Sequence, residues 1–321
     1  MQQMLYLDRG QVRDTGVDMT AIMEAVRSAF VDRAQGRAQA PPKGAIYPQP
    51  EGFINSMPAC TAQAAGIKWV SSYADNARYG IPSIHALMIL NDPQTGQPLA
   101  IMDGSWITAM RTGAVTGVCA KLMSPVKRPV VAIVGCGVQG QSNLEALTVS
   151  NPPGVVRAYD VCDETCRRFV AEARQHFPHV QMEVAATPRE AVEEADIVVT
   201  ATAIRKEPRP VLQPQWLKAG CLGFPLDYDS YWSQEAIHAC DQFWVDDQEQ
   251  FAALRSHGYF QGLRVPDGEL AALLGGCAQA RKTGRERICV MSLGLGLTDV
   301  ATAWLVYKKA LARGIGQMLP A

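Results

Sequence analysis

The chain has 321 residues and a formal net charge of −1; 48% of the residues are hydrophobic and 19% are charged. This balance is typical of a globular protein, and the length is sufficient for two domains with a large core. A nearly neutral chain is not expected to bind nucleic acid or an anionic membrane surface. No apolar run approaches the roughly 20 residues that span a bilayer, and the mixed charges near the N-terminus argue against a signal peptide.

The cysteine and histidine content points away from disulfides and metal sites. The nine cysteines are scattered along the chain, and none belongs to a C-x-x-C pair. Free thiols in this number favour a reducing compartment, so we expect a cytoplasmic protein. His176 and His179 form an H-x-x-H pair with no third ligand beside it, so we expect no metal site.

The first 120 residues predict a small α+β region. One stretch with helical spacing is followed by short apolar runs that Gly, Pro and Asn separate, a pattern typical of strands in an antiparallel or mixed sheet. The segment NDPQTGQPL, which follows the third run, is a hairpin-turn signal. The predicted helix covers residues 19–36, and the predicted strands cover 52–60, 64–73 and 83–92.

From Pro129 onward the pattern changes to buried strands that alternate with helices. Such alternation predicts a doubly wound parallel sheet. The segment KLMSPVKR, residues 121–128, is the best candidate for a domain boundary, and the last helix is expected to fold back on the first domain. Strands are predicted at 129–135, 154–160, 181–186, 196–203 and 287–296, and helices at 138–149, 164–176, 188–195 and 297–313.

A glycine-rich loop lies between the first strand and the first helix of this second region. Gly135, Gly137 and Gly140 form G-x-G-x-x-G, with Val138 and Gln139 between the last two glycines. The first glycine permits a tight turn, the second lets the backbone approach a pyrophosphate, and the third permits close packing of helix and strand. Because the motif stands in its βαβ context, we predict a Rossmann domain that binds a dinucleotide.

Asp160 ends the next predicted strand, where a carboxylate accepts hydrogen bonds from the ribose hydroxyls and repels a 2′-phosphate. The sequence therefore predicts NAD as cofactor rather than NADP. Thr200 and Thr202 end the strand 196–203, at the edge where open α/β sheets bind ligands, and we expect them near the nicotinamide. A structural role as β-branched residues is nearly as consistent with their position.

Basic residues interrupt apolar segments of the first region. Lys68 lies in AAGIKWVSS, and Arg111 is the only charge in WITAMRTGAVTG. A buried cation needs a partner, and the guanidinium fork suits a carboxylate, so these residues predict either a structural ion pair or a site for an anionic substrate. Lys43 is less constrained, and its sequence context is also consistent with a solvated side chain.

Together these segments resemble the ornithine cyclodeaminase and mu-crystallin family, which includes alanine dehydrogenases and ketimine reductases. The resemblance implies an α/β architecture in which residues 1–120 bind substrate and form a dimer, 121–296 form the NAD-binding Rossmann domain, and the helix at about 297–321 returns to the first domain. The matching segments are GIKWV, ITAMRTGAVTG, VAIVGCGVQGQS, AYD, EADIVVTAT, AGCLGFPLDYDSYWSQE and MSLGLGLTDVATAWLVYKKALARG.

The resemblance also implies roles for individual residues. Lys68 and Arg111 correspond to residues that bind the substrate carboxylate, Ser83 and Lys43 fall near others that contact it, and Thr112 resembles a residue at the cofactor phosphates. Lys43 replaces a family arginine, which weakens two-point recognition.

Three further positions bear on the chemistry. Asp229 matches the family's acid-base residue, whereas Asp227 falls at a family glycine and is expected to orient the turn or a neighbouring cation. Asn55 replaces a glutamate beside the second amine of ornithine, so a shorter amino acid or an imine is the expected substrate.

The sequence thus predicts an NAD(H)-dependent oxidoreductase that transfers hydride at the α-carbon of an amino acid or its imine. Asp229 is the expected proton carrier, and Lys68 can serve as an acid if burial lowers its pKa. The alternatives are a cyclodeaminase that releases ammonia and a non-enzymatic protein that binds a small ligand with the cofactor. We expect a small carboxylate-bearing partner and a homodimer.

Overall fold

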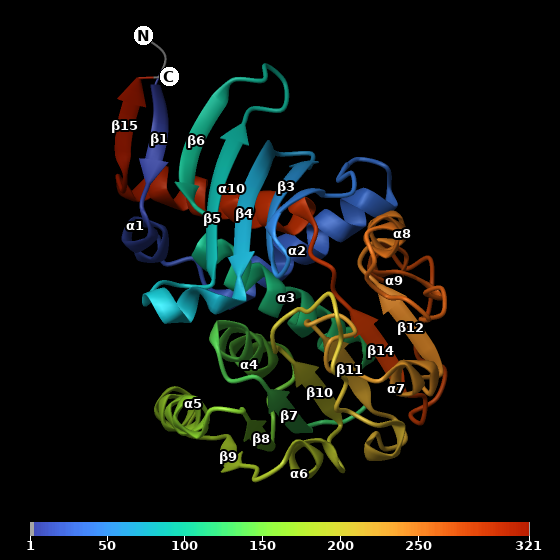
Figure 1. The fold of residues 1–321 in the computed structure, drawn as a ribbon. Coiled ribbons are helices and arrows are strands. Elements are labelled where there is room, and N and C mark those ends of the chain that lie inside the picture. The colour runs from blue at the N-terminus through green and yellow to red at the C-terminus, as the bar shows by residue number, and fades with distance from the viewer. Residues whose placement is uncertain (1–2, 321) are drawn as a thin grey trace. The chain divides into compact units, whose positions relative to one another are not determined.

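The computed structural model describes residues 3–320 and separates the chain into two compact units. The first unit comprises Met1–Arg111 and Gly294–Ala321, and the second comprises Thr112–Leu293. The division falls within helix α3 (Ser105–Met123), after Arg111. Figure 1 shows the elements of each unit in chain order.

The first unit is built on a seven-stranded mixed sheet in the order β15-β1-β6-β5-β4-β3-β2. The β1–β6 pair is parallel and the other neighbouring pairs are antiparallel. In β5 every second residue is buried, because alternate side chains of a strand point to opposite faces. The strands are β1 (Gln3–Leu7), β2 (Gly44–Gln49), β3 (Gly52–Cys60), β4 (Ala65–Tyr73), β5 (Ile84–Asn91), β6 (Pro98–Asp103) and β15 (Gln317–Pro320).

Helix α10 (Gly296–Arg313) packs on β3, β4 and β5 and also against α2 (Met19–Ala34). Asp18 caps α2 by accepting a hydrogen bond from the Ala21 amide at 2.9 Å, and Gly314 ends α10 with a left-handed φ of 63°. The C-terminal helix thus covers one face of the sheet. The shorter helices of this unit are α1 (Arg9–Asp14) and a 3-10 turn at Ala74–Tyr79.

The other face of the same sheet carries apolar side chains. Ile67, Ile89, Ile101 and Tyr6 stand directly opposite one another across β4, β5, β6 and β1. Trp69 and Leu87 form the neighbouring pair and are 48% and 51% exposed. We call these six residues the apolar sheet face.

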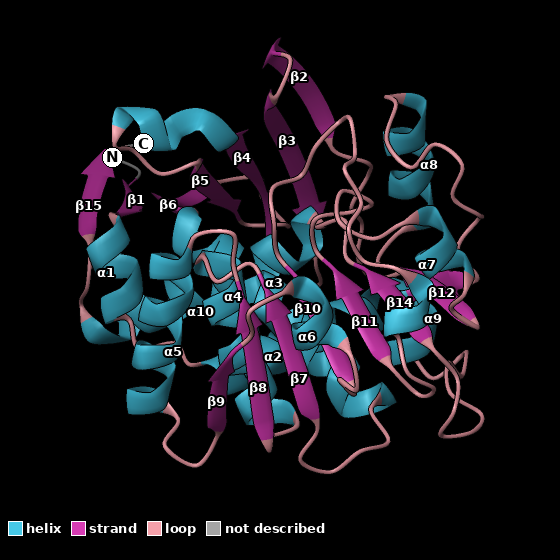
Figure 2. Ribbon diagram, turned by 60° about the horizontal axis from the view of Figure 1, so that its bottom comes forward, coloured by secondary structure: helices cyan, strands magenta, loops and turns pink. Residues whose placement is uncertain are grey.

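The second unit contains an eight-stranded sheet in the order β13-β12-β14-β11-β10-β7-β8-β9, and the strand pairs are parallel. The strand order reverses at β7 and β10, which is where doubly wound sheets bind ligands. Figure 2 shows β7, β8 and β9 side by side. The strands are β7 (Val130–Val134), β8 (Val155–Tyr159), β9 (Gln181–Val184), β10 (Ile197–Thr200), β11 (Leu222–Pro225), β12 (Gln242–Val245), β13 (Gly268–Glu269) and β14 (Ile288–Met291).

Six α-helices of the second unit connect these strands. The Thr187 side chain caps α6, and Asp247 caps α8. The helices are α4 (Val138–Ser150), α5 (Asp163–His176), α6 (Pro188–Val192), α7 (Gln234–His238), α8 (Gln248–Ser256) and α9 (Leu270–Leu274), with a 3-10 turn at Pro214–Trp216.

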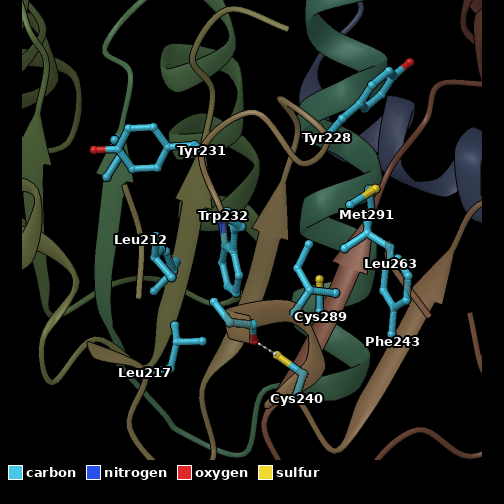
Figure 3. Close-up of a cluster of buried hydrophobic side chains, with 14 of the residues drawn as sticks. Leu212, Leu217, Tyr228, Tyr231, Trp232, Cys240, Phe243, Leu263, Cys289 and Met291 are labelled. Carbon is cyan, nitrogen blue, oxygen red and sulfur yellow. Dashed lines mark hydrogen bonds between the residues drawn. The ribbon is translucent and has the colours of Figure 1, made fainter. Parts of the chain in front are cut away.

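An aromatic core fills the second unit around β11, β12 and β14. Trp232 points into this cluster, and Leu212, Leu217 and Cys289 belong to it as well (Figure 3). A side chain at Gly223 would meet the Trp232 ring at 2.3 Å, so the indole lies directly on β11. The residues that follow β11 are therefore anchored by a buried aromatic side chain.

The predicted α/β class, with a parallel Rossmann sheet and a separate α+β region, is confirmed. The helix predicted at 188–195 is shorter, because it ends at Val192 and Glu194 takes a left-handed φ of 63°. The prediction missed β11, β12 and β13, which have at most four residues each and show no alternation, and it also missed the helices α7, α8 and α9. No described helix has the length and apolarity required to cross a membrane.

Candidate active site

Three buried charged side chains meet in the first unit. Lys68 on β4 places Nζ 2.7 Å from Oδ1 of Asp299, and Arg111 on α3 places Nε 2.9 Å from the same oxygen. The side chains of Lys68 and Asp299 are at most 1% exposed, and that of Arg111 is 7% exposed. We call these residues the cation cluster. Charges buried to this degree require direct partners, and Asp299 is the partner of both cations.

The strand register explains why Lys68 is buried. Its direct neighbours across the sheet are Met57 on β3 and Met88 on β5, and the helix-facing side of the sheet is apolar. Burial lowers the pKa of Lys68 to about 7, with a further contribution from the Arg111 charge, while Asp299 acts in the opposite direction. Lys68 therefore titrates near neutral pH, which ordinary lysines do not do.

The other predicted substrate residues of this unit lie in different environments. Asn55 is buried and stands opposite Val70, so the two-residue period of a strand places it on the same face as Lys68. Lys43 is half-buried, and its charge contributes to lowering the pKa of Lys68. Ser83 is exposed, and its backbone carbonyl accepts a hydrogen bond from the Tyr73 amide at 2.8 Å.

In the second unit the glycine loop follows β7 at the point where the strand order reverses. A side chain at Gly135, whose φ is +96°, would lie 2.5 Å from the Ala201 carbonyl, and one at Gly140 would lie 2.3 Å from the Gly135 carbonyl. By contrast, nothing lies within 4 Å of a side chain built at Gly137. The first and third glycines thus permit close packing, while the second leaves room beside the N-terminus of α4, as a pyrophosphate requires.

Asp160 holds this loop in place. Its Oδ2 accepts the Cys136 amide at 2.8 Å, and its Oδ1 accepts the Cys162 amide at 2.9 Å. Of the other residues predicted at the cofactor, Val138 is 65% exposed, Gln139 is half-buried and Thr112 is buried in α3.

Asp227 binds the two threonines at the end of β10. Its Oδ1 accepts the Thr200 hydroxyl at 2.6 Å, and its Oδ2 accepts the Thr202 amide at 3.1 Å and the Thr202 hydroxyl at 2.6 Å. The Thr200 hydroxyl also accepts the Trp232 indole N–H at 3.1 Å. Burial raises the pKa of Asp227, and these hydrogen bonds act against that rise. Asp227 thus fastens the end of β10 to the turn after β11.

Asp229 follows two residues later in the same turn, beyond Tyr228, which takes a left-handed φ of 62°. Asp229 is buried, and its Oδ1 has no hydrogen-bond partner within residues 3–320. Burial raises the pKa of this carboxyl, and backbone hydrogen bonds, including one to Phe260, act against the rise. A buried carboxylate with one unpaired oxygen and a raised pKa is suited to exchange a proton with a ligand.

Sequence reasoning missed Asp299. It lies in ICVMSLGLGLTDVATAWLVY, where it is the only charged residue. The same signal, a lone charge in an apolar segment, had identified Lys68 and Arg111. Within residues 3–320, no group of three or more His, Cys, Asp or Glu is placed to hold a metal ion.

Comparisons with known proteins identify the family of the chain. The model of the ornithine cyclodeaminase/mu-crystallin family matches residues 9–314. An alanine dehydrogenase of Archaeoglobus fulgidus is 35% identical over 316 residues, which cover 94% of each chain.

Two solved structures share the fold of this chain. The Δ1-pyrroline-2-carboxylate reductase of Thermococcus litoralis, in complex with NADH and L-proline, is 29% identical, with a TM-score of 0.88 over 98% of this chain and 99% of that one. An archaeal alanine dehydrogenase dimer with bound NAD is 31% identical, with a TM-score of 0.87 over 99% of both chains. With a glycine loop, a cation cluster and an acidic turn on a fold shared over its whole length, the chain belongs to the ornithine cyclodeaminase/mu-crystallin family.

Proposed function

We propose that the protein is an NAD(H)-dependent oxidoreductase that transfers hydride at the α-carbon of an amino acid or its imine. The cation cluster is the observation that carries this proposal. Two buried cations, Lys68 and Arg111, share a single carboxylate, Asp299, so the protonated cluster has a net charge of +1. A small anion, such as the carboxylate of an amino acid, balances that charge.

The glycine loop is the proposed cofactor site. The open space at Gly137 admits a pyrophosphate, and Asp160 lies where the ribose of the adenosine half binds in such domains. The structural relatives bound to NAD or NADH support this assignment. When bound, NAD(H) supplies or accepts the hydride.

The protein's own residues then have separable roles. Arg111 and Lys68 hold the substrate carboxylate and thereby fix the position of the α-carbon, which is catalysis by orientation. Asp229 takes a proton from the substrate nitrogen during oxidation, using the oxygen that has no protein partner. Lys68, with its pKa near 7, is able to donate a proton when an imine is reduced.

Asn55 favours this reaction over ornithine cyclodeamination. It is buried on the face of the sheet that carries Lys68, and its side chain is a neutral amide. An amide cannot neutralise a second cationic amine, as a carboxylate at this position could. A substrate with one nitrogen, or a cyclic imine, therefore fits better than ornithine.

The test is a substrate screen. Amino acids would be incubated with NAD, and 2-oxo acids plus amines, or cyclic imines, with NADH, while NADH absorbance and ammonia release are followed. Catalytic change in NADH with at least one carboxylate substrate is the expected result. Ammonia release from a diamino acid without net change in NADH would instead identify a cyclodeaminase. Tight ligand binding with neither signal would identify a binding protein.

We also propose a homodimer formed through the apolar sheet face. Ile67, Ile89, Ile101 and Tyr6 make a continuous apolar row across four strands, and Trp69 and Leu87 beside them are about half exposed. Exposed apolar surface of this extent marks an interaction site. The related archaeal alanine dehydrogenase is a dimer, which supports the same assembly here.

Analytical ultracentrifugation tests the dimer. Wild-type protein at micromolar concentration should sediment with the mass of two chains, and Leu87→Lys should sediment with the mass of one, because a charge would be buried in the interface. Val265→Lys is the matched control, since Val265 is an exposed residue of the second unit. A wild-type protein that sediments only as a single chain would remove this proposal.

A further inference from the structure

Asp299 contacts both cations of the cation cluster. One of its oxygens, Oδ1, accepts both Lys68 Nζ and Arg111 Nε, and these residues are separated from it by 231 and 188 positions in the chain. The other oxygen, Oδ2, is buried and has no hydrogen-bond partner among the described residues. A single oxygen atom therefore contacts both cations.

The position of Asp299 in α10 supports this arrangement. Asp299 lies in the first turn of the helix, which begins at Gly296. A carboxylate is stabilised near a helix N-terminus by the helix dipole. The side chain is carried by a helix that packs directly on β3, β4 and β5.

Gly294 lies close to the guanidinium group of Arg111. A side chain built at Gly294, whose φ is +82°, would lie 3.1 Å from both Nη1 and Nη2 of Arg111. Asp299 binds Nε, and the two terminal nitrogens remain outside that contact. A residue larger than glycine at position 294 would therefore crowd the terminal nitrogens, which a two-oxygen partner such as a carboxylate contacts.

We propose that Asp299 is the positioning residue of the substrate site: its Oδ1 holds Lys68 and Arg111 at the spacing at which both can bind one carboxylate. This inference rests on the proposed function where it takes the bound carboxylate to be that of the substrate. The contact of Lys68 and Arg111 with one oxygen of Asp299 does not depend on the proposed function. Without the Asp299 charge the two cations would repel each other in a buried site, with Lys43 adding a third positive charge.

The first test measures the pKa of Lys68 rather than enzymatic activity. The protein would be labelled at the ε-carbon of lysine, and the Lys68 signal, assigned with Lys68→Met, would be followed by NMR as pH is changed. Asp299→Asn keeps the shape but removes the charge, so the pKa of Lys68 should fall below its wild-type value near 7. Thr302→Val is the control, because Thr302 is buried in the same helix and its hydroxyl donates to the Thr298 carbonyl at 2.8 Å.

The second test measures carboxylate binding. L-proline would be titrated into the protein saturated with NADH, and its dissociation constant should rise roughly 10-fold or more in Asp299→Asn, as expected when a charge-assisted contact is disturbed. The dissociation constant for NADH should stay unchanged in both Asp299→Asn and Thr302→Val. An unchanged Lys68 pKa in folded Asp299→Asn would overturn the inference.

A third variant covers the case in which Asp299→Asn does not fold. In Arg111→Gln, Lys68 loses a repelling charge and no longer shares Asp299, so the pKa of Lys68 should rise. A Lys68 pKa that does not change in Arg111→Gln would overturn the shared contact. If wild-type protein shows neither L-proline binding nor turnover in the substrate screen, the proposed function fails, while the NMR titrations still decide the role of Asp299.

Discussion

The two units bury charged side chains in opposite ways. In the first unit, Lys68 and Arg111 lie against a carboxylate of opposite sign, and one oxygen serves both. In the second unit, two acids lie in one turn, and neither forms an ion pair within residues 3–320. Asp227 is bound by hydroxyl and amide groups of Thr200 and Thr202, and Asp229 keeps one oxygen without a partner among these residues.

This difference assigns the positioning of a ligand to the first unit and proton transfer to the second. A buried ion pair fixes geometry, because breaking it leaves an uncompensated charge. A buried acid with an unpaired oxygen has a proton affinity that is raised by burial and can be changed by a ligand. The cation cluster therefore suits the binding of a fixed anionic group, and Asp229 suits proton transfer.

The largest expected effect is at Asp229. Asp229→Asn keeps the size of the side chain but removes its basicity, so turnover should fall by roughly 10²–10⁴-fold, the range typical of general acid-base groups. Affinity for NADH, measured by fluorescence titration, should stay nearly unchanged. Full turnover in this variant would show that Asp229 carries no proton.

The second prediction concerns pH and Lys68. Since its pKa is lowered to about 7, Lys68 is protonated below that pH and loses its charge above it. Both carboxylate binding and proton donation need the charged form. The kcat/KM for imine reduction should therefore fall about 10-fold per pH unit above pH 7, as for loss of a single required proton.

Lys68→Met supplies the control for that profile. Its residual activity should lack the decline that begins near pH 7. Folding stability provides an independent check, because the unfolded state binds the Lys68 proton up to its ordinary pKa of 10.5 while the folded state releases it near 7. Between these values the free energy of unfolding should rise with pH in wild type relative to Lys68→Met. A profile that is identical in both proteins would contradict the prediction.

The part of the second unit from β7 to β10 could be predicted from local sequence, since β7 and β10 are apolar runs and the loop Gly135–Gly140 follows a strand directly. The helices and strands between β10 and β14 were not predicted. Strands β1 and β15 were not predicted, because each is short and becomes a strand only by pairing with the opposite end of the chain.

The site was predictable to the extent that its residues stand out locally. Lys68 and Arg111 do so, as lone charges in apolar segments. Their common partner could not be identified from spacing, since Asp299 lies 231 and 188 residues away. The contrast between Asp227 and Asp229 also depends on contacts with β10 that no local pattern contains.

The third prediction concerns cofactor choice. Asp160→Asn removes the charge that would repel a 2′-phosphate but keeps one oxygen acceptor for the loop amides. The ratio of the dissociation constants for NADPH and NADH should shift toward NADPH by roughly 10-fold, about 1.4 kcal/mol. Asp163→Asn is the matched control, an exposed acid three residues further along. A wild-type preference for NADPH would overturn the assignment of NAD.

The smallest effect on activity is expected at Asp227. Asp227→Asn can accept hydrogen bonds at only one of its two terminal atoms, so either Thr200 or the Thr202 pair loses a partner. The free energy of unfolding should fall by about 1–3 kcal/mol, the cost of leaving a buried polar group unpaired, while turnover changes less than about 10-fold. Thr202→Val removes part of the same contact from the other side, so the double variant should lose less stability than the sum of the single ones. If Asp227→Asn is the inactive variant and Asp229→Asn retains turnover, the roles assigned to the two acids are reversed. Asp227, which contacts the end of β10, would then be the proton carrier.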